Sequence, residues 1–293
     1  MIINMREQKI EIEKIQTFNL KDIFECGQCF RWNKNESGIY VGIVGQNVLK
    51  IKENDYKIVI ESYGQDDLEE LFNNYFDMNR NYEEIKNKLR SIDGYMEESI
   101  KYGEGIRILN QDLWETIISF IISANNNIPR IKGIIEKMCK EYGTRIVWNN
   151  EEFYTFPSVE QLSKASVNDL RKLGLGFRDI RIYETTKLIK DGIIDLEILH
   201  KQKDTDALRE ELLKLSGVGP KVADCILLFS TLKRFDVFPI DVWVRRVMND
   251  LYIKNKNENK VSKKQILDIA NIKFGDICGL AQQYLFYWKR SIG

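Results

Sequence analysis

The sequence has little of what several common functional classes require. Its 293 residues include a single histidine, His200. One histidine is too few for a histidine-rich metal centre, and it argues against a Ser-His-Asp triad. The five cysteines are scattered and odd in number, which makes a poor disulfide framework. Cys26 and Cys29 have the CxxC spacing of a metal or redox site, but no second pair completes a zinc site.

Charge and hydropathy exclude further classes. Lys plus Arg and Asp plus Glu number 44 each, so the net charge is zero and any basic surface must be local. No uncharged apolar run reaches about 18 residues, which excludes a membrane-spanning helix. The N-terminal stretch alternates charged with aliphatic residues and has no apolar signal core. With 43% hydrophobic residues and only four prolines, the composition indicates a well-packed cytosolic protein.

The sequence divides into two parts with different hydrophobic periodicity. In residues 38–53 and 56–64 apolar and polar residues alternate and β-branched residues are common, as in antiparallel strands. From about residue 105 onward apolar residues recur at helical spacing, so this part is predicted to be almost wholly helical. We therefore expect an α+β protein, with an antiparallel β domain with short helices over 1–104 and an α-helical domain over 105–293.

Local signals mark several helix ends. Asn110 is predicted to cap the helix that follows it. The segments Ser158–Gln161 and Ser166–Asp169 have the spacing of capping boxes, in which two side chains satisfy each other's backbone groups. Gly143 and Gly174 are predicted to end helices, because glycine adopts the backbone conformation that closes a helix.

One segment breaks the helical pattern. SGVGPKVADC, residues 216–225, places two glycines, a proline and a lysine inside a predicted helical hairpin over 207–230. Gly217 and Gly219 permit a positive φ and the close approach of another backbone, and Pro220 suits the first turn of a helix. The free N–H groups of such a turn, with the helix N-terminus, form an anion site that suits a phosphate. A plain hairpin that uses its glycines as helix stops explains the same pattern.

Lys221 and Asp241 add reactive groups to this hairpin. Lys221 lies in the first turn of a helix whose apolar face is Val222, Ile226 and Phe229. The positive end of the helix dipole and partial burial disfavour a charged amine, and an uncharged amine is a nucleophile for carbonyl-like carbons. Asp241 is predicted to cap the next helix, and a carboxylate facing the lysine would stabilise a developing cation. A solvated or phosphate-binding lysine and an ordinary capping aspartate are the simpler alternatives.

The order L-x-G-V-G-x-K-x-A followed by P-I-D resembles the helix-hairpin-helix DNA glycosylase superfamily. From about residue 20 to the end, the chain resembles eukaryotic-type 8-oxoguanine DNA glycosylase/lyases in the segments GQCFRW, ILNQDLWE, FIISANNNIPRI, FPS, LGLGFR and GLAQQYLFYW. The resemblance implies that the turn at Gly217 and Gly219 grips DNA phosphates, that Lys221 attacks the sugar, and that Asp241 is essential. We therefore expect a monomeric DNA repair enzyme that acts on duplex DNA containing 8-oxoguanine and needs neither cofactor nor metal.

The resemblance also assigns a pocket for the damaged base. Gly27 corresponds to the glycine whose carbonyl accepts the N7–H of 8-oxoguanine, where guanine has a lone pair and is repelled. Cys225 and Phe286 correspond to the residues that stack on the two faces of the extruded base, and Gln282 to the amide that reads its Watson–Crick edge. Phe229 lies in the pocket wall, where the family has methionine. Core packing is the simpler explanation of the cysteine and of each aromatic residue taken alone.

A second group corresponds to the residues that fill the gap left by the extruded base: Asn125, Arg130, Phe177 and Arg178. Arginine side chains offer only donors, and cytosine N3 and O2 are both acceptors, so cytosine is the predicted partner opposite the lesion. Phe177 replaces a common tyrosine. Trp243 stands two residues after the aspartate, where the family has histidine, and is assigned to the same DNA-binding group.

Two other functions remain compatible with the residues. A glycosylase for oxidised pyrimidines or other modified bases would use the same lysine and aspartate. A non-enzymatic helix-hairpin-helix module that binds DNA phosphates would need the hairpin alone, and the pairing of Lys221 with Asp241 argues against it. The endonuclease-III branch carries a four-cysteine iron–sulfur cluster after its helical domain. Only Cys278 lies that late here, so no such cluster is predicted.

Overall fold

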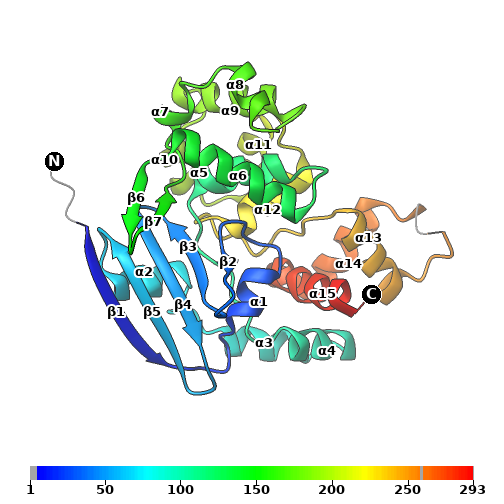
Figure 1. Cartoon of the computed structure of the whole chain (residues 1–293). Coiled ribbons are helices and arrows are strands. Elements are labelled where there is room, and N and C mark those ends of the chain that lie inside the picture. The colour runs from blue at the N-terminus through cyan, green and yellow to red at the C-terminus, as the bar shows by residue number, and fades with distance from the viewer. Residues whose placement is uncertain (1–4, 258–259, 293) are drawn as a thin grey trace.

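The computed structural model describes residues 5–257 and 260–292. Within them, one antiparallel sheet has the strand order β1-β5-β4-β3-β2 (Figure 1). Its strands are β1 (Arg6–Glu13), β2 (Asn33–Lys34), β3 (Tyr40–Val44), β4 (Asn47–Glu53) and β5 (Lys57–Gly64). Strands β3 to β5 confirm the alternation seen in the sequence. Strand β1 was not predicted, and it pairs antiparallel with β5 along its whole length.

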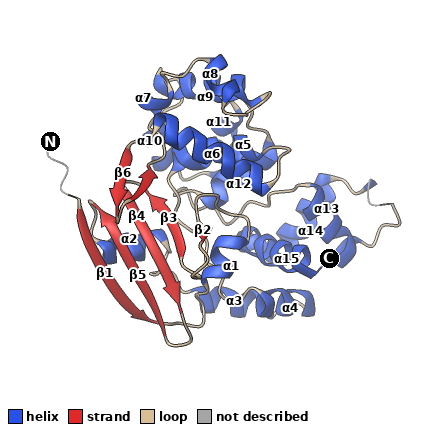
Figure 2. Ribbon diagram, viewed as in Figure 1, coloured by secondary structure: helices blue, strands red, loops and turns tan. Residues whose placement is uncertain are grey.

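The sheet buries one face under two short helices, α1 (Leu20–Glu25) and α2 (Leu68–Tyr75) (Figures 1 and 2). Ile51, Ile58 and Ile60 of the sheet are fully buried and share a hydrophobic cluster with Phe24 of α1 and Phe72 of α2. Because side chains alternate between the faces of a strand, this apolar set lies on one side and the charged residues on the other. Packing against the sheet fixes the position of α1 and of the loop that follows it.

The remainder of the described chain is mostly helical (Figure 2). Its elements are α3 (Tyr82–Arg90), α4 (Gly94–Tyr102), α5 (Leu113–Ser123), α6 (Ile128–Tyr142), α7 (Val159–Leu162), α8 (Val167–Lys172), α9 (Arg178–Lys190), α10 (Leu196–Lys201), α11 (Thr205–Leu213), α12 (Pro220–Phe229), α13 (Val242–Met248), a π-helical turn η1 (Asn249–Ile253), α14 (Lys263–Phe274), a 3-10 turn η3 (Gly275–Ile277) and α15 (Cys278–Ile292). Among the residues described, no helix is both long and apolar enough to cross a membrane.

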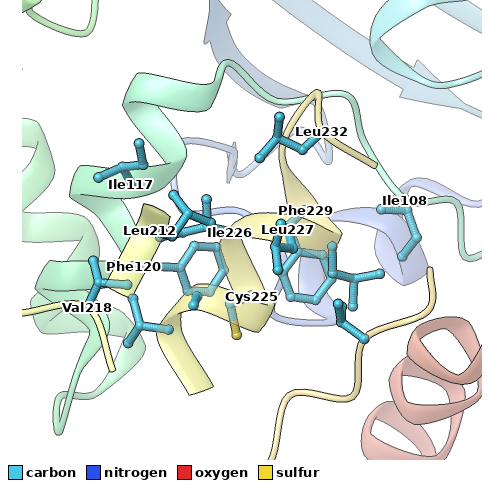
Figure 3. Packing of buried hydrophobic residues seen from close by; sticks show 14 of the residues in the cluster. Ile108, Ile117, Phe120, Leu212, Val218, Cys225, Ile226, Leu227, Phe229 and Leu232 are labelled. Atoms are coloured by element: carbon cyan, nitrogen blue, oxygen red, sulfur yellow. The ribbon is translucent and has the colours of Figure 1, made fainter. Parts of the chain in front are cut away.

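Helix α12 lies at the centre of the helical part and packs against α5 and α11. All its residues from Val222 to Phe229 are buried, which explains why its apolar positions are not confined to one stripe. Figure 3 shows Phe120 of α5 next to Phe229 of α12, and their rings stack with 5.6 Å between centroids. Helices α3 and α4 also contribute to this helical core, through Leu89 and Met96. The division of the chain at residue 104 remains a prediction.

The prediction of an almost wholly helical second part is wrong for one short segment. Strands β6 (Arg145–Trp148) and β7 (Glu151–Tyr154) form a hairpin whose turn residues, Asn149 and Asn150, both have positive φ angles. Asparagine tolerates this conformation, as a two-residue hairpin turn requires. Trp148 stacks on Tyr63 of β5, with 6.2 Å between ring centroids. The four-residue strands are too short to give a detectable alternation. The hairpin is stabilised instead by its contact with the sheet, which is distant in the sequence.

The helix ends follow the predicted signals with one exception. The capping boxes at Ser158–Gln161 and Ser166–Asp169 are both present. Asn110 does not cap α5: Asp112 does so, by accepting a hydrogen bond of 2.8 Å from the Glu115 N–H. The Asn110 side chain instead donates to a main-chain carbonyl in the last turn of α2. The helix thus begins two residues later than the sequence analysis placed it.

Candidate active site

One pocket gathers residues from distant segments of the chain. Its walls come from the loop after α1, from α5, from α12 and the segment before α13, and from α15. The lining residues are Gly27, Phe120, Lys221, Cys225, Phe229, Pro239, Asp241, Gln282, Gln283 and Phe286. Every residue that the sequence assigned to the damaged base or to catalysis is among them. Phe120, Pro239 and Gln283 were not predicted, because nothing in the sequence distinguishes them from residues that only pack.

The hairpin between α11 and α12 has one left-handed residue. Gly217 has a φ of +85°, and a Cβ atom there would lie only 2.8 Å from Cδ of Arg181. Gly219 does not follow the predicted positive φ: its φ is −97°, and it caps α12 with extended backbone. Pro220 is the first residue of α12, as predicted. Gly219 is exposed, so the N–H groups at the start of α12 are open to an anion.

Lys221 points its amine into the pocket region, 5.6 Å from the ring centroid of Phe120. The charge of Cys225, and after it that of Asp241, raises the pKa of Lys221 against the burial that lowers it. Burial also raises the pKa of the Cys225 thiol. This direction is opposite to the lowering expected from the sequence for Lys221, because the neighbouring groups outweigh the effect of burial on the pKa of Lys221.

Asp241 has a place in both the fold and the pocket. It caps α13, as predicted, and Oδ1 accepts a hydrogen bond of 2.8 Å from the Val244 N–H. Its position at the pocket wall brings a carboxylate to the same cavity as Lys221. Trp243, in the first turn of α13, is half-buried and lies outside the pocket lining. The aspartate is thus fixed by the helix that it starts, which holds its charge in place near the lysine.

Helix α15 closes the pocket with an amide and an aromatic ring. Gln282 and Phe286 are four residues apart and so lie on one face of the helix. Gln282 is only 5% exposed, yet its Oε1 atom is buried without a hydrogen-bond partner. A buried polar atom in this state costs about 1–3 kcal/mol. Its presence in a pocket wall indicates a site that is completed by a hydrogen-bond donor on a ligand.

Gly27 faces this wall from the loop after α1. Its φ is +91°, and a Cβ atom there would lie 3.2 Å from Nη1 of Arg290 and 3.5 Å from Cε1 of Phe286. The left-handed backbone conformation is the reason for glycine at this position. Figure 1 shows α1 beside α15, and the Gln283 side chain joins them by donating a 2.7 Å hydrogen bond to the Cys26 carbonyl.

The four residues assigned to the gap in the DNA lie around the start of α6 and of α9. Asn125 is exposed with a φ of +52°, and Phe177 is 54% exposed just before α9. Arg130 is exposed and donates a hydrogen bond of 3.2 Å to the Gly174 carbonyl. The structure therefore places an aromatic side chain and an accessible guanidinium on one surface outside the pocket.

Arg178 has different surroundings from Arg130. It is only 2% exposed, and its guanidinium donates to the carbonyls of Ala124, Asn125 and Leu175. These hydrogen bonds hold the turn at Asn125. The prediction that Arg178 offers free donors to a base does not hold in this structure, because those donors are taken by the protein itself.

Comparison with known proteins identifies the family. Residues 9–117 match the N-terminal domain of 8-oxoguanine DNA glycosylase, and residues 118–271 match the HhH-GPD superfamily of base excision DNA repair proteins. The chain belongs to this glycosylase family. A probable N-glycosylase/DNA lyase of Methanothermobacter thermautotrophicus is 34% identical over 246 residues, which are 77% of this chain and 75% of the relative.

Two solved members of the family have the same fold. MBOgg1 in complex with a low-affinity DNA ligand is 41% identical, with a TM-score of 0.90 over all of both chains. The Clostridium acetobutylicum 8-oxoguanine glycosylase/lyase, solved with double-stranded DNA containing cytosine opposite 8-oxoguanine, is 39% identical, with a TM-score of 0.89 over 100% of this chain and 99% of that one. The predictions of an α+β glycosylase and of an enzyme of base excision repair are confirmed, and the alternative of a non-enzymatic binding module is set aside.

The five cysteines of this glycosylase are free and buried. Cys26 and Cys29 are free, buried thiols, and burial raises the pKa of Cys26 to about 11 and that of Cys29 further. Protonated thiols neither attack nor bind metals well. Over the described ranges, no group of three or more histidine, cysteine or acidic side chains is arranged to hold a metal ion. Cys26 packs in the hydrophobic cluster of the helical part, and Cys29 packs in that of the sheet.

Proposed function

We propose that this glycosylase excises 8-oxoguanine from duplex DNA and then nicks the strand through a Schiff base on Lys221. The observation that carries the proposal is the unpaired Gln282 oxygen in the pocket wall opposite Gly27. An extruded 8-oxoguanine carries N–H donors on its Watson–Crick edge for that oxygen, and an N7–H donor for the Gly27 carbonyl. Guanine lacks the N7–H, so its lone pair would face the carbonyl unpaired.

The stacking surfaces of the pocket suit a flat ring. Extrusion of a base costs a few kcal/mol, which stacking and edge contacts recover. Cys225 and Phe286 line the pocket and supply one surface each. Phe229 continues the wall, stacked on Phe120. These contacts hold the base while the sugar is turned toward the start of α12.

The chemistry then follows from Lys221 and Asp241. The amine gives up a proton to the departing base, and its lone pair forms a bond to the sugar C1′ as the bond from C1′ to the base breaks. The base leaves with the bonding electrons and takes up a proton. Asp241 stabilises the positive charge that develops on the sugar. Opening of the sugar ring gives the Schiff base, and loss of a C2′ proton expels the 3′ phosphate, which nicks the strand before water releases the lysine.

The surface around α6 and α9 would take the opposite strand. We propose that Phe177 and Asn125 fill the gap left by the base and that Arg130 reads cytosine, while the exposed turn at Gly219 binds a phosphate. Trp243 would contact the DNA backbone near α13. We also propose that the protein acts as a monomer and lies in the cytosol with its DNA. Equal excision opposite all four bases would contradict the role in reading cytosine.

Borohydride trapping tests the central claim. Wild-type protein should form a reduced covalent complex with duplex DNA that contains 8-oxoguanine, and Lys221→Gln should bind this DNA but not trap. Loss of the nucleophile should lower excision by about 1,000-fold or more. Lys233→Met is the matched control, because it removes a buried lysine outside the pocket and should trap like wild type. Trapping by Lys221→Gln, or rapid cutting at thymine glycol but not at 8-oxoguanine, would contradict the proposal.

A further inference from the structure

The loop that carries Gly27 is held on both sides by side-chain amides. Gln283 donates a 2.7 Å hydrogen bond to the Cys26 carbonyl, and Gln111 donates a 2.8 Å hydrogen bond to the Gln28 carbonyl. The carbonyl between these two belongs to Gly27. The peptide groups on either side of it are therefore fixed by donors from α15 and from the segment before α5.

Gln111 has a second partner at the far end of α12. Its Nε2 atom also donates a 2.9 Å hydrogen bond to the carbonyl of Phe229, the last residue of that helix. Its main-chain carbonyl accepts a 2.8 Å hydrogen bond from the Thr231 N–H. One amide group thus joins the loop of Gly27 to the helix that begins with Pro220 and Lys221.

Gln28 ties the same loop to the segment that leads to Gln111. It is fully buried, and its side chain donates to the Arg107 carbonyl at 2.8 Å and accepts from the Leu109 N–H at 2.9 Å. A third bond, of 2.9 Å, runs to the Ile23 carbonyl at the end of α1. The loop, residues 107–111 and the end of α12 are consequently one hydrogen-bonded unit that links the β-sheet part to the catalytic helix.

We propose that Gln111 is a positioning residue for lesion recognition: it holds the Gly27 carbonyl in register with Cys225 and Lys221 on α12. This inference deepens the proposed function and rests on it. Recognition of an N7–H depends on where one carbonyl oxygen lies, since a hydrogen bond weakens steeply with misalignment. Nicking at a sugar that has already lost its base needs Lys221 and Asp241 but has no base to recognise. Loss of Gln111 should therefore separate the two activities.

The test compares excision with nicking in the variant Gln111→Met, which keeps the side-chain length and removes both donors. Single-turnover excision of 8-oxoguanine opposite cytosine should slow by about 10-fold to 100-fold, since small misplacements in a reacting complex have effects of this size. Nicking of duplex DNA with a preformed abasic site should stay within about 2-fold of the wild-type rate, because this reaction does not depend on where the Gly27 carbonyl lies. The ratio of 8-oxoguanine to guanine excision should fall as well.

Tyr82→Phe is the matched control. The Tyr82 hydroxyl is buried and accepts a 2.9 Å hydrogen bond from the Ile108 N–H, so the variant loses a buried contact of the same segment without touching the loop of Gly27. Its two activities should change together. If Gln111→Met does not fold, Gln111→Asn keeps one amide too short to span both carbonyls and should show the same separation.

Two results would overturn the inference in distinguishable ways. If the Gln111 variants fold and lose excision and nicking in parallel, or keep both, Gln111 has no role in recognition. If wild-type protein nicks abasic sites but does not excise 8-oxoguanine, the proposed substrate itself is wrong, and the role of Gln111 falls with it.

Discussion

The two regions assigned to DNA differ in how their polar groups are satisfied. In the pocket, the Gln282 amide oxygen is buried with no partner. On the surface around α6 and α9, the Arg178 guanidinium is equally buried, but it donates to three main-chain carbonyls. The pocket therefore contains a buried acceptor without a donor, whereas the donors of Arg178 are all directed to the protein itself.

This difference shows that residue type and position are not enough to assign a contact. Arg130 and Arg178 match the same family feature, yet only Arg130 has an accessible guanidinium. A buried group without a partner reduces stability, so where the fold retains one in a cavity, a ligand is the simplest reason. A buried group with all its partners needs no ligand. The comparison predicts opposite responses to substitution in the two regions.

Among the substitutions that compare the two regions, Gln282→Met should have the largest effect on activity. Excision of 8-oxoguanine should fall by about 100-fold, because a site built to bond a ligand N–H discriminates strongly when that bond is lost. The free protein should melt at the same temperature or higher, since the substitution removes an unpaired buried acceptor. Single-turnover kinetics and thermal unfolding measure the two effects.

Gln283→Met is the matched control on the next residue of α15. Its amide is satisfied by the Cys26 carbonyl, so this variant should melt at a lower temperature. Equal destabilisation by Gln282→Met and Gln283→Met would show that the Gln282 oxygen has a partner in solution, and the contrast between the two regions would be lost.

Arg178→Ala should mainly change stability. The substitution leaves the Ala124 and Asn125 carbonyls without their donor, which should lower the free energy of unfolding by about 2 kcal/mol. Arg130→Ala removes an exposed side chain and should change the free energy of unfolding by less than about 0.5 kcal/mol. It should also reduce the ratio of excision opposite cytosine to excision opposite the other three bases. Urea unfolding measures the change in stability of each variant. Excision from duplexes with each opposite base measures the preference for cytosine. A stable Arg178→Ala variant that loses only the cytosine preference would contradict the structural role given to Arg178.

Most pocket residues could be named from the sequence because they lie in short motifs that resemble those of the glycosylase family. Lys221 and Cys225 are one turn apart on α12, and Gln282 and Phe286 are one turn apart on α15. Gln111 could not be assigned a role in this way. Its partners Gln28 and Phe229 are 83 and 118 positions away, and both are main-chain carbonyls, which any residue supplies.

Two of the predictions that the structure corrects, the pKa shift of Lys221 and the helical assignment of residues 145–154, used neighbours in the chain alone. The charge of Lys221 was inferred from its own helix, but Asp241, on another element, contributes to its pKa. The hairpin of β6 and β7 depends on the packing of Trp148 against the sheet. Strands β3 to β5 were found because each has a two-residue periodicity of its own.

A second buried lysine extends the comparison between satisfied and unsatisfied groups. Lys233 follows α12, as Lys221 begins it, and its amine donates to the Ile108 carbonyl and lies 3.4 Å from Asp77. Burial nevertheless lowers the pKa of Lys233 to about 7, while that of Lys221 is raised. Lys233 has the depressed pKa expected of a nucleophile but lies outside the pocket, so the geometry of the pocket, and not the pKa, points to Lys221.

Lys233 is also expected to make the stability of the protein depend on pH. Between about pH 7 and its ordinary pKa of 10.5 the unfolded chain binds a proton at Lys233 that the folded protein does not. The contribution of this group to stability therefore rises with pH in that window, by at most about 1.4 kcal/mol per pH unit. Lys233→Met should exceed wild type in unfolding free energy most at pH 7, and by less at pH 9, in urea titrations of both proteins. A difference that does not change with pH would mean that Asp77 keeps the folded amine charged, and that the interior at this end of α12 accommodates an ammonium as the pocket does.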